Sequence, residues 1–404
     1  MESVSDVMET EKSVIPVWDE DFYGDDFLRD PIPRYARMRE MGPVVWVAPQ
    51  KMWAVTHHAP ICEAARDAGT FISGKGLSLS DEVNAMLIGS TLHSDGARHH
   101  RTRSITSRPI MPRNLAPLQD AITETAEALA EDLVAKGRFD AVHDFAEVLP
   151  LTIVTDLIGL TGADKADLLR WASATFNLFD GFNARSREAL PEMKQLQAFL
   201  KEHLRPEALK AGGLASRVFE LAPEQGFTPA EAAQLLRDYI NPSLDTTISA
   251  SGFAALYFAE HPDQWQALRD NPGLIPNAVE EIVRLVTPIR GFSRYVAQDT
   301  ELAGARMAES DRVFLVYASG NRDAAVFADP DRFDVTRPVR KHLGFGHGVH
   351  ACMGMHLARA EMVALLTAMV RRVARWHLDG TPEIAMNNTI RAFARCPVRV
   401  EALS

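Results

Sequence analysis

The sequence reads Phe345-Gly346-His347-Gly348-Val349-His350-Ala351-Cys352-Met353-Gly354 where a glycine-rich loop runs into a helical pattern. A free thiol has a pKa of about 8.5, and the first turn of a helix supplies partial positive charge and N–H donors that favour the thiolate. Gly348 and Gly354 lack side chains at points where a backbone or a flat macrocycle must come close. The stretch therefore predicts a thiolate at Cys352 that could bind iron.

Two other interpretations of this stretch stay open on spacing alone. One is a zinc site, which would indicate a metallohydrolase or a structural knuckle. Its ligands would be His347, His350, Cys352 and His356. Along a tight loop that enters a helix these side chains would fan out rather than converge, so the spacing disfavours zinc. The other interpretation is a buried, inert cysteine.

The pattern Phe-x-x-Gly-x-His-x-Cys-x-Gly over residues 345–354, followed by Leu357-Ala358-Arg359, resembles the haem-binding loop of the cytochrome P-450 superfamily. The resemblance implies a haem-thiolate monooxygenase with haem b, its iron ligated by the Cys352 thiolate and its macrocycle against Phe345 and Gly354. It also implies a mainly α fold in one domain over residues 1–404, with a long central helix over the haem. A smaller β-containing part is expected at about residues 40–60 and 290–320 and in the C-terminal strands.

A second family element lies at Glu281-Ile282-Val283-Arg284, where the three-residue spacing puts a carboxylate and a guanidinium on one helix face. Such pairs are common on protein surfaces, and alone they contribute little. Residues 327–334 and Arg337 resemble the stretch that the family calls its meander. The resemblance implies a buried ion-pair network of Glu281, Arg284 and Arg337 that holds the cysteine loop.

A third element is a set of basic residues suited to the haem propionates. His99 and Arg103 lie four residues apart, on one face of an expected helix, and Gly96-Ala97 stands where the family often has two prolines. Arg294 and His350 match the remaining propionate partners of the family. Charge-assisted hydrogen bonds from such groups are roughly twice as strong as neutral ones.

The long helix carries Asp245-Thr246-Thr247, which matches the acid and alcohol pair of the family. The resemblance implies that Thr246 positions a water and that Asp245 feeds the protons needed to cleave the O–O bond. Pro242-Ser243 departs from the small residues that the family usually has just upstream. Proline removes one N–H and leaves the carbonyl of Asp238 without its helical donor, so the departure puts the relay geometry in doubt and would release peroxide if the relay were uncoupled.

Periodicity and turn signals predict most other elements. A hairpin is expected from residues 43–49 and 52–57, and strands over residues 294–316. Helices are expected over residues 118–135, 148–158 and 276–286, and from just after Cys352 to near Trp376. The capping signal at Thr228 predicts a single helix of about thirty residues to His261, some ~45 Å long.

The helical period of 100° per residue places Asp238, Asn241 and Pro242 near the face of Thr246 and therefore in the cavity. The other expected pocket residues are Lys75, Leu77, Phe176, Phe179 and Ile289. An acidic group at Asp238 disfavours an anionic ligand, and a phenol, alcohol or amine could donate to it unless Lys75 pairs with it instead. Residues 71–81 and 387–391 look most like bacterial family members that act on small methoxylated or alkylated aromatics, which suggests oxidative O-demethylation.

Composition bounds the remaining possibilities. The chain has 404 residues, 46% hydrophobic and 24% charged, so it can bury a large core. The net charge of −11 argues against a nucleic-acid partner, and no apolar run approaches the ~18 residues of a membrane span. Three cysteines are too few for a disulfide framework, and the first residues lack signal-peptide character, so a cytoplasmic protein is expected.

Electrons for such an enzyme would come from a separate protein, because the sequence has no glycine-rich dinucleotide fingerprint and no cysteine cluster for an iron–sulfur centre. A basic patch suggests an acidic, ferredoxin-type partner. It consists of Arg98, Arg101, Arg103, Arg108 and Arg113. A non-catalytic haem-thiolate sensor is the alternative, although binding alone would not need Asp245 and Thr246. A peroxide-driven enzyme is a nearer variant.

Overall fold

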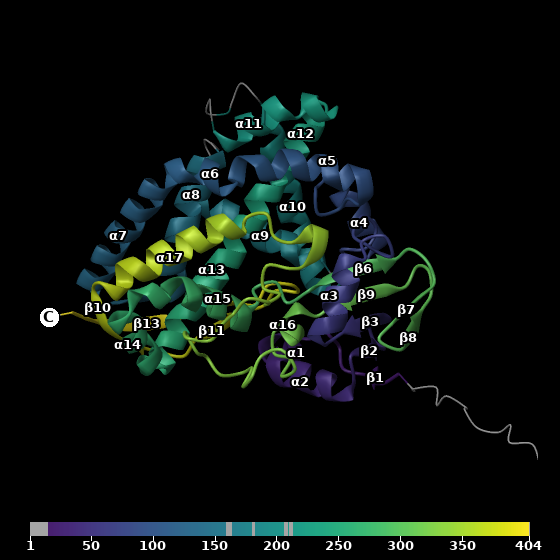
Figure 1. Cartoon of the computed structure of the whole chain (residues 1–404). Helices are drawn as coiled ribbons and strands as arrows, with labels where there is room; N and C mark the ends of the chain where they lie inside the picture. The colour runs from purple at the N-terminus through teal and green to yellow at the C-terminus, as the bar shows by residue number, and fades with distance from the viewer. Residues whose placement is uncertain (1–14, 159–163, 180–181, 206–208, 210–212, 404) are drawn as a thin grey trace, which may run out of the picture.

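Helices make up most of the molecule, and the strands gather mainly at one side of it (Figure 1). The computed structural model describes residues 15–158, 164–179, 182–205, 209 and 213–403. The α-helices are α1 Asp25–Arg29, α2 Pro31–Met41, α3 His58–Arg66, α4 Asp81–Leu87, α5 Gly96–Ser107, α6 Pro112–Leu115, α7 Gln119–Lys136, α8 Val148–Ile158, α9 Lys165–Asn177, α10 Ala184–His203, α11 Leu214–Leu221, α12 Pro229–Leu235, α13 Arg237–Glu260, α14 Pro262–Asp270, α15 Ile275–Val286, α16 Tyr317–Gly320 and α17 Met355–Val370.

The strands form one larger sheet and three small ones. The larger sheet has the order β1-β2-β3-β9-β6-β4, and the small ones pair β10-β13-β5, β11-β12 and β7-β8. Their bounds are β1 Val17–Trp18, β2 Val44–Val47, β3 Met52–Val55, β4 Phe71–Ile72, β5 Arg138–Asp140, β6 Phe292–Val296, β7 Thr300–Leu302, β8 Ala305–Met307, β9 Arg312–Leu315, β10 Val373–Leu378, β11 Glu383–Ala385, β12 Ala392–Arg395 and β13 Pro397–Ala402.

The larger sheet contains the expected hairpin, since β2 and β3 pair antiparallel with Trp46 opposite Trp53. Successive side chains of a strand point to opposite faces. Val313 and Leu315 of β9 therefore join a core on one face, while Phe314 joins a second core on the other. The helices enclose the third and largest core. The sequence and the structure thus agree on a mainly α fold with a smaller β-containing part.

The long helix differs from its prediction at its start. Thr228 forms the expected capping box with Glu231, but the helix that it begins, α12, ends at Leu235. Leu236 makes short-range backbone bonds, accepting from Tyr239 N at 3.1 Å, and α13 starts at the next residue. The single helix of thirty residues was therefore wrong: α13 has 24 residues, about 36 Å. It contacts α8, α9, α15 and α17, which makes it the central helix.

The last helix is also shorter than predicted. α17 ends at Val370, and Trp376 lies in β10, opposite Val400 of β13. Val373 and Trp376 are buried in the strand, so pairing with the C-terminal strand takes over from the apolar pattern that suggested more helix. The helices expected over residues 118–135, 148–158 and 276–286 appear as α7, α8 and α15, each within one residue of its predicted bounds. No helix of the described residues is both long and apolar enough to cross a bilayer.

Candidate active site

The cysteine loop is held in a tight conformation against α3. Gly346 and Gly348 have φ values of 70° and 71°, which side-chain-bearing residues rarely adopt. A Cβ on Gly348 would lie 2.1 Å from the carbonyl oxygen of Ala65, so only glycine fits there. A Cβ on Gly354 would approach nothing closer than Sγ of Cys352, at 3.9 Å, so the chain itself does not demand glycine at that position. The backbone N–H of Cys352 donates to Phe345 at 2.7 Å and closes the loop.

The Cys352 thiol lines a large cavity and exposes its surface toward it. Burial raises the pKa of this thiol, while the N–H groups of Gly354 and Met355 and the charges of Arg103 and Arg359 act to lower it. The helix start thus supplies the predicted donors. Their effect on the pKa of Cys352 is smaller than the cost of desolvating a charged sulfur among apolar neighbours.

The cavity lies between α13, the cysteine loop and α17. It brings together most residues that the sequence nominated: Arg103, Phe176, Phe179, Asp238, Pro242, Thr246, Ile289, Arg294, Phe345, His350, Cys352 and Gly354. Lys75, Leu77, His99 and Asp245 are not part of its lining, and the side chain of Asn241 is outside the part of the chain that the structure describes. Lys75 instead places its ammonium over the ring of Tyr295, 5.5 Å from the centroid.

Basic groups meet at one edge of this cavity, and the carboxylate of Asp95 lies beside one of them, with its Oδ1 atom 3.8 Å from Nε2 of His350. Arg294 is 2% exposed and donates to the Ser293 carbonyl, and Arg103 donates to the Ala351 carbonyl at 2.5 Å. Neither guanidinium forms an ion pair with any described carboxylate. The rings of His99 and His350 lie 4.3 Å apart, and the Nε2 atom of each has no hydrogen-bond partner among the described residues.

Buried cations and unpartnered ring nitrogens are costly unless an anion meets them. A flat group that carries carboxylates and a metal able to bind a thiolate would fit these residues, and haem is such a group. His99, Arg103, Arg294 and His350 would then hold the propionates, and Cys352 would hold the iron.

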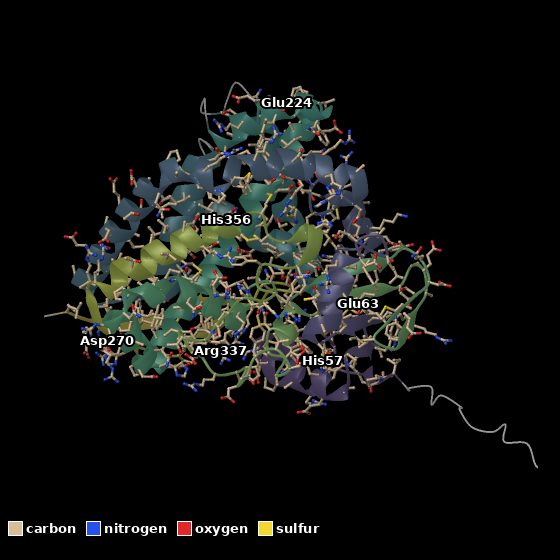
Figure 2. The ribbon with its side chains drawn as sticks, viewed as in Figure 1. His57, Glu63, Glu224, Asp270, Arg337 and His356 are labelled. Atoms are coloured by element: carbon tan, nitrogen blue, oxygen red, sulfur yellow. The ribbon has the colours of Figure 1, made fainter. Side chains whose placement is uncertain are left out.

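The zinc interpretation finds no support in the described residues, which contain no cluster of three or more His, Cys, Asp or Glu side chains able to hold a metal ion. His356 is exposed on α17 (Figure 2).

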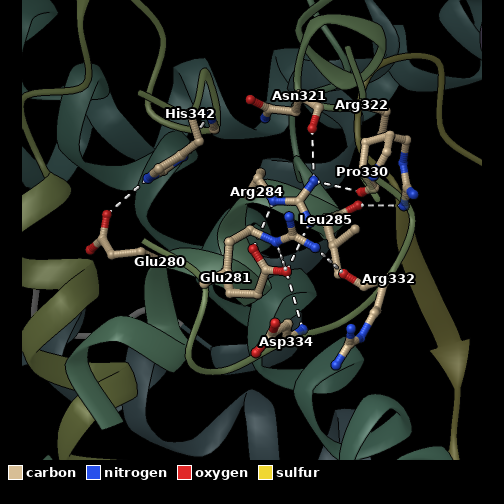
Figure 3. Close-up of polar contacts among 12 residues, drawn as sticks. Glu280, Glu281, Arg284, Leu285, Asn321, Arg322, Pro330, Arg332, Asp334 and His342 are labelled. Atoms are coloured by element: carbon tan, nitrogen blue, oxygen red, sulfur yellow. Dashed lines mark hydrogen bonds and ion pairs between the residues drawn. The ribbon is translucent and has the colours of Figure 1, made fainter. Parts of the chain in front are cut away.

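A buried ion-pair network surrounds Glu281 and Arg284 of α15 (Figure 3). Glu281 and Arg284 are fully buried, and Arg284 donates from two nitrogens to the two carboxylate oxygens at 2.7 and 2.8 Å. Arg337 donates to Glu281 at 3.0 Å and to the carbonyls of Ala328, Asp329 and Arg332. The carboxylate therefore joins α15 to the irregular stretch that ends at Arg337.

Asn321 carries this network to the cysteine loop. Arg284 donates to its carbonyl at 2.8 Å, and its side-chain oxygen accepts from the backbone N–H of Leu343 at 2.5 Å. Leu343 is two residues before Phe345. One continuous set of hydrogen bonds thus connects the buried pair to the loop that holds Cys352.

A second clamp was missed in the sequence. Glu280 binds His342, before the cysteine, at 2.8 Å, and Arg359, after it, at 2.6 and 2.9 Å. Burial alone would raise the pKa of Glu280, but the hydrogen bonds and charges of His342 and Arg359 outweigh it and lower the pKa to about 2. Its partners lie 62 and 79 residues away in the chain, so no local pattern marks it.

The acid and alcohol pair sits on the middle of α13. The Thr246 hydroxyl donates to the carbonyl of Pro242 at 2.7 Å and faces the cavity. Asp245 is not part of the cavity lining, and burial together with the nearby charge of Glu147 raises the pKa of its carboxyl to about 8. Asp245 therefore holds a proton at neutral pH.

Another cavity wall, formed by α9 and α10, is tied to the turn at residues 387–389. The last carbonyls of a helix lack intrahelical donors. Here the side chain of Asn388 donates to the Asn177 carbonyl at 2.7 Å, and Thr389 donates to the Phe176 carbonyl at 2.8 Å. Asn183 and Arg185 at the start of α10 both donate to the Asn388 oxygen. We call this set the α9–α10 clasp.

The five arginines of the expected basic patch are divided among several contacts. Arg103 lines the cavity. Arg98 and Arg108 pair with Glu231 and Glu224, the latter at the top of the molecule in Figure 2, and Arg98 and Arg101 lie over the ring of Phe227. Segment 224–231 thus neutralises part of the patch, while Arg113 is exposed.

Comparisons with known proteins agree with this geometry. A family model described as Cytochrome P450 matches residues 213–400. Cytochrome p450 CYP199A2 of Rhodopseudomonas palustris is 34% identical over 379 residues, 93% of this chain and 92% of that protein. Cytochrome P450 monooxygenase PikC of Streptomyces venezuelae is 30% identical over 406 residues, 95% of this chain and 94% of that protein.

The solved structures that resemble this chain include cytochrome P450 CREJ in complex with (4-ethylphenyl) dihydrogen phosphate. It has a TM-score of 0.84 and 27% sequence identity, and it covers 93% of this chain and 98% of its own. The similarity therefore extends over nearly the whole chain and not only over the cysteine loop.

Proposed function

The chain belongs to the cytochrome P450 family, whose members hold haem through a cysteine thiolate, and on this premise we propose that it oxidises a small aromatic substrate. It is a haem-dependent monooxygenase that inserts one atom of O2. Within that activity, the proposed reaction is hydroxylation, including O-demethylation of a methoxy-aromatic compound. The proposed electron source is a separate, acidic ferredoxin-type protein, and the proposed organisation is a single domain.

One observation carries this proposal: the Cys352 sulfur lines a cavity together with Thr246 of α13, and the guanidiniums of Arg103 and Arg294 line the same cavity and donate to carbonyl groups. Haem bound there supplies the chemistry of O2 reduction, which thiolate ligation favours. Arg103, Arg294, His99 and His350 would hold its carboxylates, and the two carboxylates Glu280 and Glu281 would keep the loop in place.

The geometry of α13 supports a proton relay in spite of Pro242. The Thr246 hydroxyl donates to the carbonyl four residues back, so its lone pairs are left to accept a hydrogen bond from solvent in the cavity. Asp245, next to it in the chain, carries a proton at neutral pH because of its raised pKa. We infer that Asp245 supplies this proton through solvent molecules. Thr246 would orient the solvent molecule that finally donates the proton in the cavity.

The aromatic character of the substrate is supported by the cavity wall. The ring centroids of Phe176 and Phe179 lie 5.8 Å apart in an edge-on arrangement. Ile289 and Pro242 add apolar surface to the same cavity. The CREJ structure holds an ethylphenyl compound, which is an aromatic ligand in a protein of the same fold.

Two measurements test the proposal. The reduced carbon monoxide complex should show the red-shifted Soret band of thiolate ligation, and Cys352→Ser should lose it. With surrogate redox partners and 18O2, a panel of methoxy- and alkyl-substituted aromatics should yield products that carry one labelled oxygen, or formaldehyde where a methyl group is removed. A thiolate band without any oxygenated product would instead support the sensor alternative.

A further inference from the structure

We propose that Asp238 selects the substrate: its carboxylate accepts a hydrogen bond from a hydroxyl or amino group at one end of a small aromatic molecule and rejects aromatic carboxylates. The substrate class is thus a phenol, benzylic alcohol or benzylic amine with an alkyl or alkoxy group opposite the donor. This inference rests on the proposed function, since it names the substrate of the same cavity.

Asp238 lies at the correct end of the cavity for an anchor. It sits in the first turn of α13, and Thr246 lies eight residues later, about 12 Å along the helix axis. Both residues line the same cavity. A ligand held at Asp238 therefore extends along α13 toward Thr246 and Cys352, and this span suits a single ring with a substituent opposite its donor group.

The carboxylate has acceptor capacity to spare. Its Oδ2 atom accepts a bond from the backbone N–H of Thr91 at 2.8 Å, and a hydrogen bond from the Thr91 side chain also lowers the pKa of the carboxyl. An ionised carboxylate offers about four acceptor sites on its two oxygens. The side chain is only half-buried, and because the group is strongly desolvated, the surface that it leaves open belongs to the cavity.

No cation among the described residues neutralises this carboxylate by a direct ion pair. Lys75, the one candidate that the sequence offered, lies over Tyr295. Arg237 and Arg103 also line the cavity, and each donates from one nitrogen to a carbonyl group, Arg237 to that of Gln234 at 3.2 Å and Arg103 to that of Ala351. Burial raises the pKa of Asp238 to about 6, against the lowering effects of Thr91, Arg237 and Arg103. The group is therefore mostly ionised at neutral pH.

The neighbouring polar groups leave Asp238 as the strongest acceptor at this end. Ser90 binds His93, its oxygen lying 3.1 Å from Nδ1, and the Thr91 hydroxyl lies 3.3 Å from that of Thr106. His93 also lines the cavity, with an unpartnered Nε2 atom, and burial lowers its pKa to about 3, so its ring is neutral and does not cancel the charge of Asp238.

An aromatic carboxylate would bring a second negative charge into this desolvated region, where like charges repel strongly. A hydroxyl or amine makes a charge-assisted bond instead, worth more than a bond between neutral groups. The flat body of either ligand would contact Phe176 and Phe179, so only the polar end distinguishes them. Asp238 thus distinguishes aromatic ligands of the same shape by the charge of their polar end group and by whether that group can donate a hydrogen bond.

The test compares four ligands of one shape on the haem-loaded protein: 4-ethylphenol, 4-ethylbenzylamine, 4-ethylbenzoate and ethyltoluene. Binding is followed at pH 7.5 by the change in Soret absorbance and, independently, by titration calorimetry. The phenol and the amine should bind at least about tenfold more tightly than ethyltoluene, and the benzoate should bind most weakly, because a hydrogen bond to a charged group contributes about 1.5–3 kcal/mol.

Asp238→Asn removes the charge and keeps the shape. It should improve benzoate binding and weaken amine binding, each by about tenfold or more. Glu260→Gln, the same change at the exposed far end of α13, should leave the order unaltered. A benzoate that binds wild-type protein as tightly as the phenol overturns the inference without any variant, and so does an unchanged order in Asp238→Asn.

The Soret band of the carbon monoxide complex, recorded on the same samples, separates the two levels of the argument. Its absence overturns the proposed function. Its presence with the reverse ligand order overturns only the role of Asp238.

Discussion

At the scale of single residues, the raised pKa of Asp245 predicts that the coupling of electron use to product formation depends on pH. With a pKa of about 8, its carboxyl is protonated at pH 7 and ionised at pH 9. A proton donor acts below its pKa, so the fraction of electrons that ends in product should fall, and the fraction released as peroxide should rise, as pH increases through 8. Asp245→Asn should give a low, flat profile over the same range.

Two variants check that this pH dependence belongs to Asp245. Glu147→Gln removes a negative charge that raises the Asp245 pKa, and it should move the midpoint to lower pH. Thr246→Ala should lose coupling at every pH while it binds substrate normally. Thr155→Ala deletes a hydroxyl with the same intrahelical bond, to the Leu151 carbonyl at 2.8 Å, but on α8, and should change nothing. If Glu147→Gln leaves the midpoint of the pH profile unchanged, the assignment of this profile to Asp245 is wrong.

The buried carboxyl of Glu361 predicts how the free energy of unfolding changes with pH. This residue of α17 lines the cavity, is 3% exposed and has an Oε2 atom without a described partner. Burial raises its pKa to about 8, against about 4.3 in an unfolded chain. Between these values the unfolded chain binds fewer protons than the folded one, so Glu361 makes the free energy of unfolding fall by up to about 1.4 kcal/mol per pH unit as pH rises.

Glu361→Gln should remove this slope. The variant should match wild type in urea unfolding near pH 4.5 and exceed it in stability by a few kcal/mol near pH 8. The comparison uses the difference between the two proteins at each pH, so the titration of all other groups cancels. Equal slopes for both proteins would show that Glu361 ionises freely in the folded state.

At the scale of elements, the ion-pair network joins α15 to the cysteine loop. Removing one partner of a buried pair leaves an uncompensated charge and costs about 3–5 kcal/mol. Glu281→Gln should therefore lower the thermal midpoint and cause loss of haem, because Arg284 and Arg337 would lose their common carboxylate.

Arg337→Lys is the milder variant in case Glu281→Gln does not fold. It keeps the charge but loses the fork that reaches three carbonyls, so an intermediate loss of stability is expected. Glu63→Gln, an exposed carboxylate on α3, is the matched control. Retention of haem and midpoint in Arg337→Lys would mean that the network is not what positions the loop.

The long helix shows what local patterns can and cannot predict. Thr228 and Glu231 marked a true helix start, because a capping box depends on residues three apart. No glycine or proline stands at the end of α12, where the sequence reads Gln234-Leu235-Leu236-Arg237. The helical pattern continues across this point. Only the packing of the two segments separates them, and a single sequence does not display it. Trp376 fits the same explanation, since its strand exists through β13.

At the scale of the whole molecule, the sequence predicted the site best where the family pattern fixes residue spacing. The cysteine loop, the pair Glu281 and Arg284 and the basic residues His99 and Arg103 could be identified because each is a short pattern. Lys75 and Leu77 were placed in the cavity from a loop whose path depends on the rest of the fold. Glu280 went unnoticed because its partners are brought to it only by folding.

The α9–α10 clasp has a consequence for how quickly ligands are admitted. The end of α9 is capped by a turn more than two hundred residues away, and the same end presents Phe176 to the cavity. Apart from Arg185, which also pairs with Asp25, its members are amide, hydroxyl and carbonyl groups, whose bonds dissolved ions barely screen. Ligand uptake through this wall should accordingly be a thermally activated process with little dependence on ionic strength, unlike the docking of a charged electron donor.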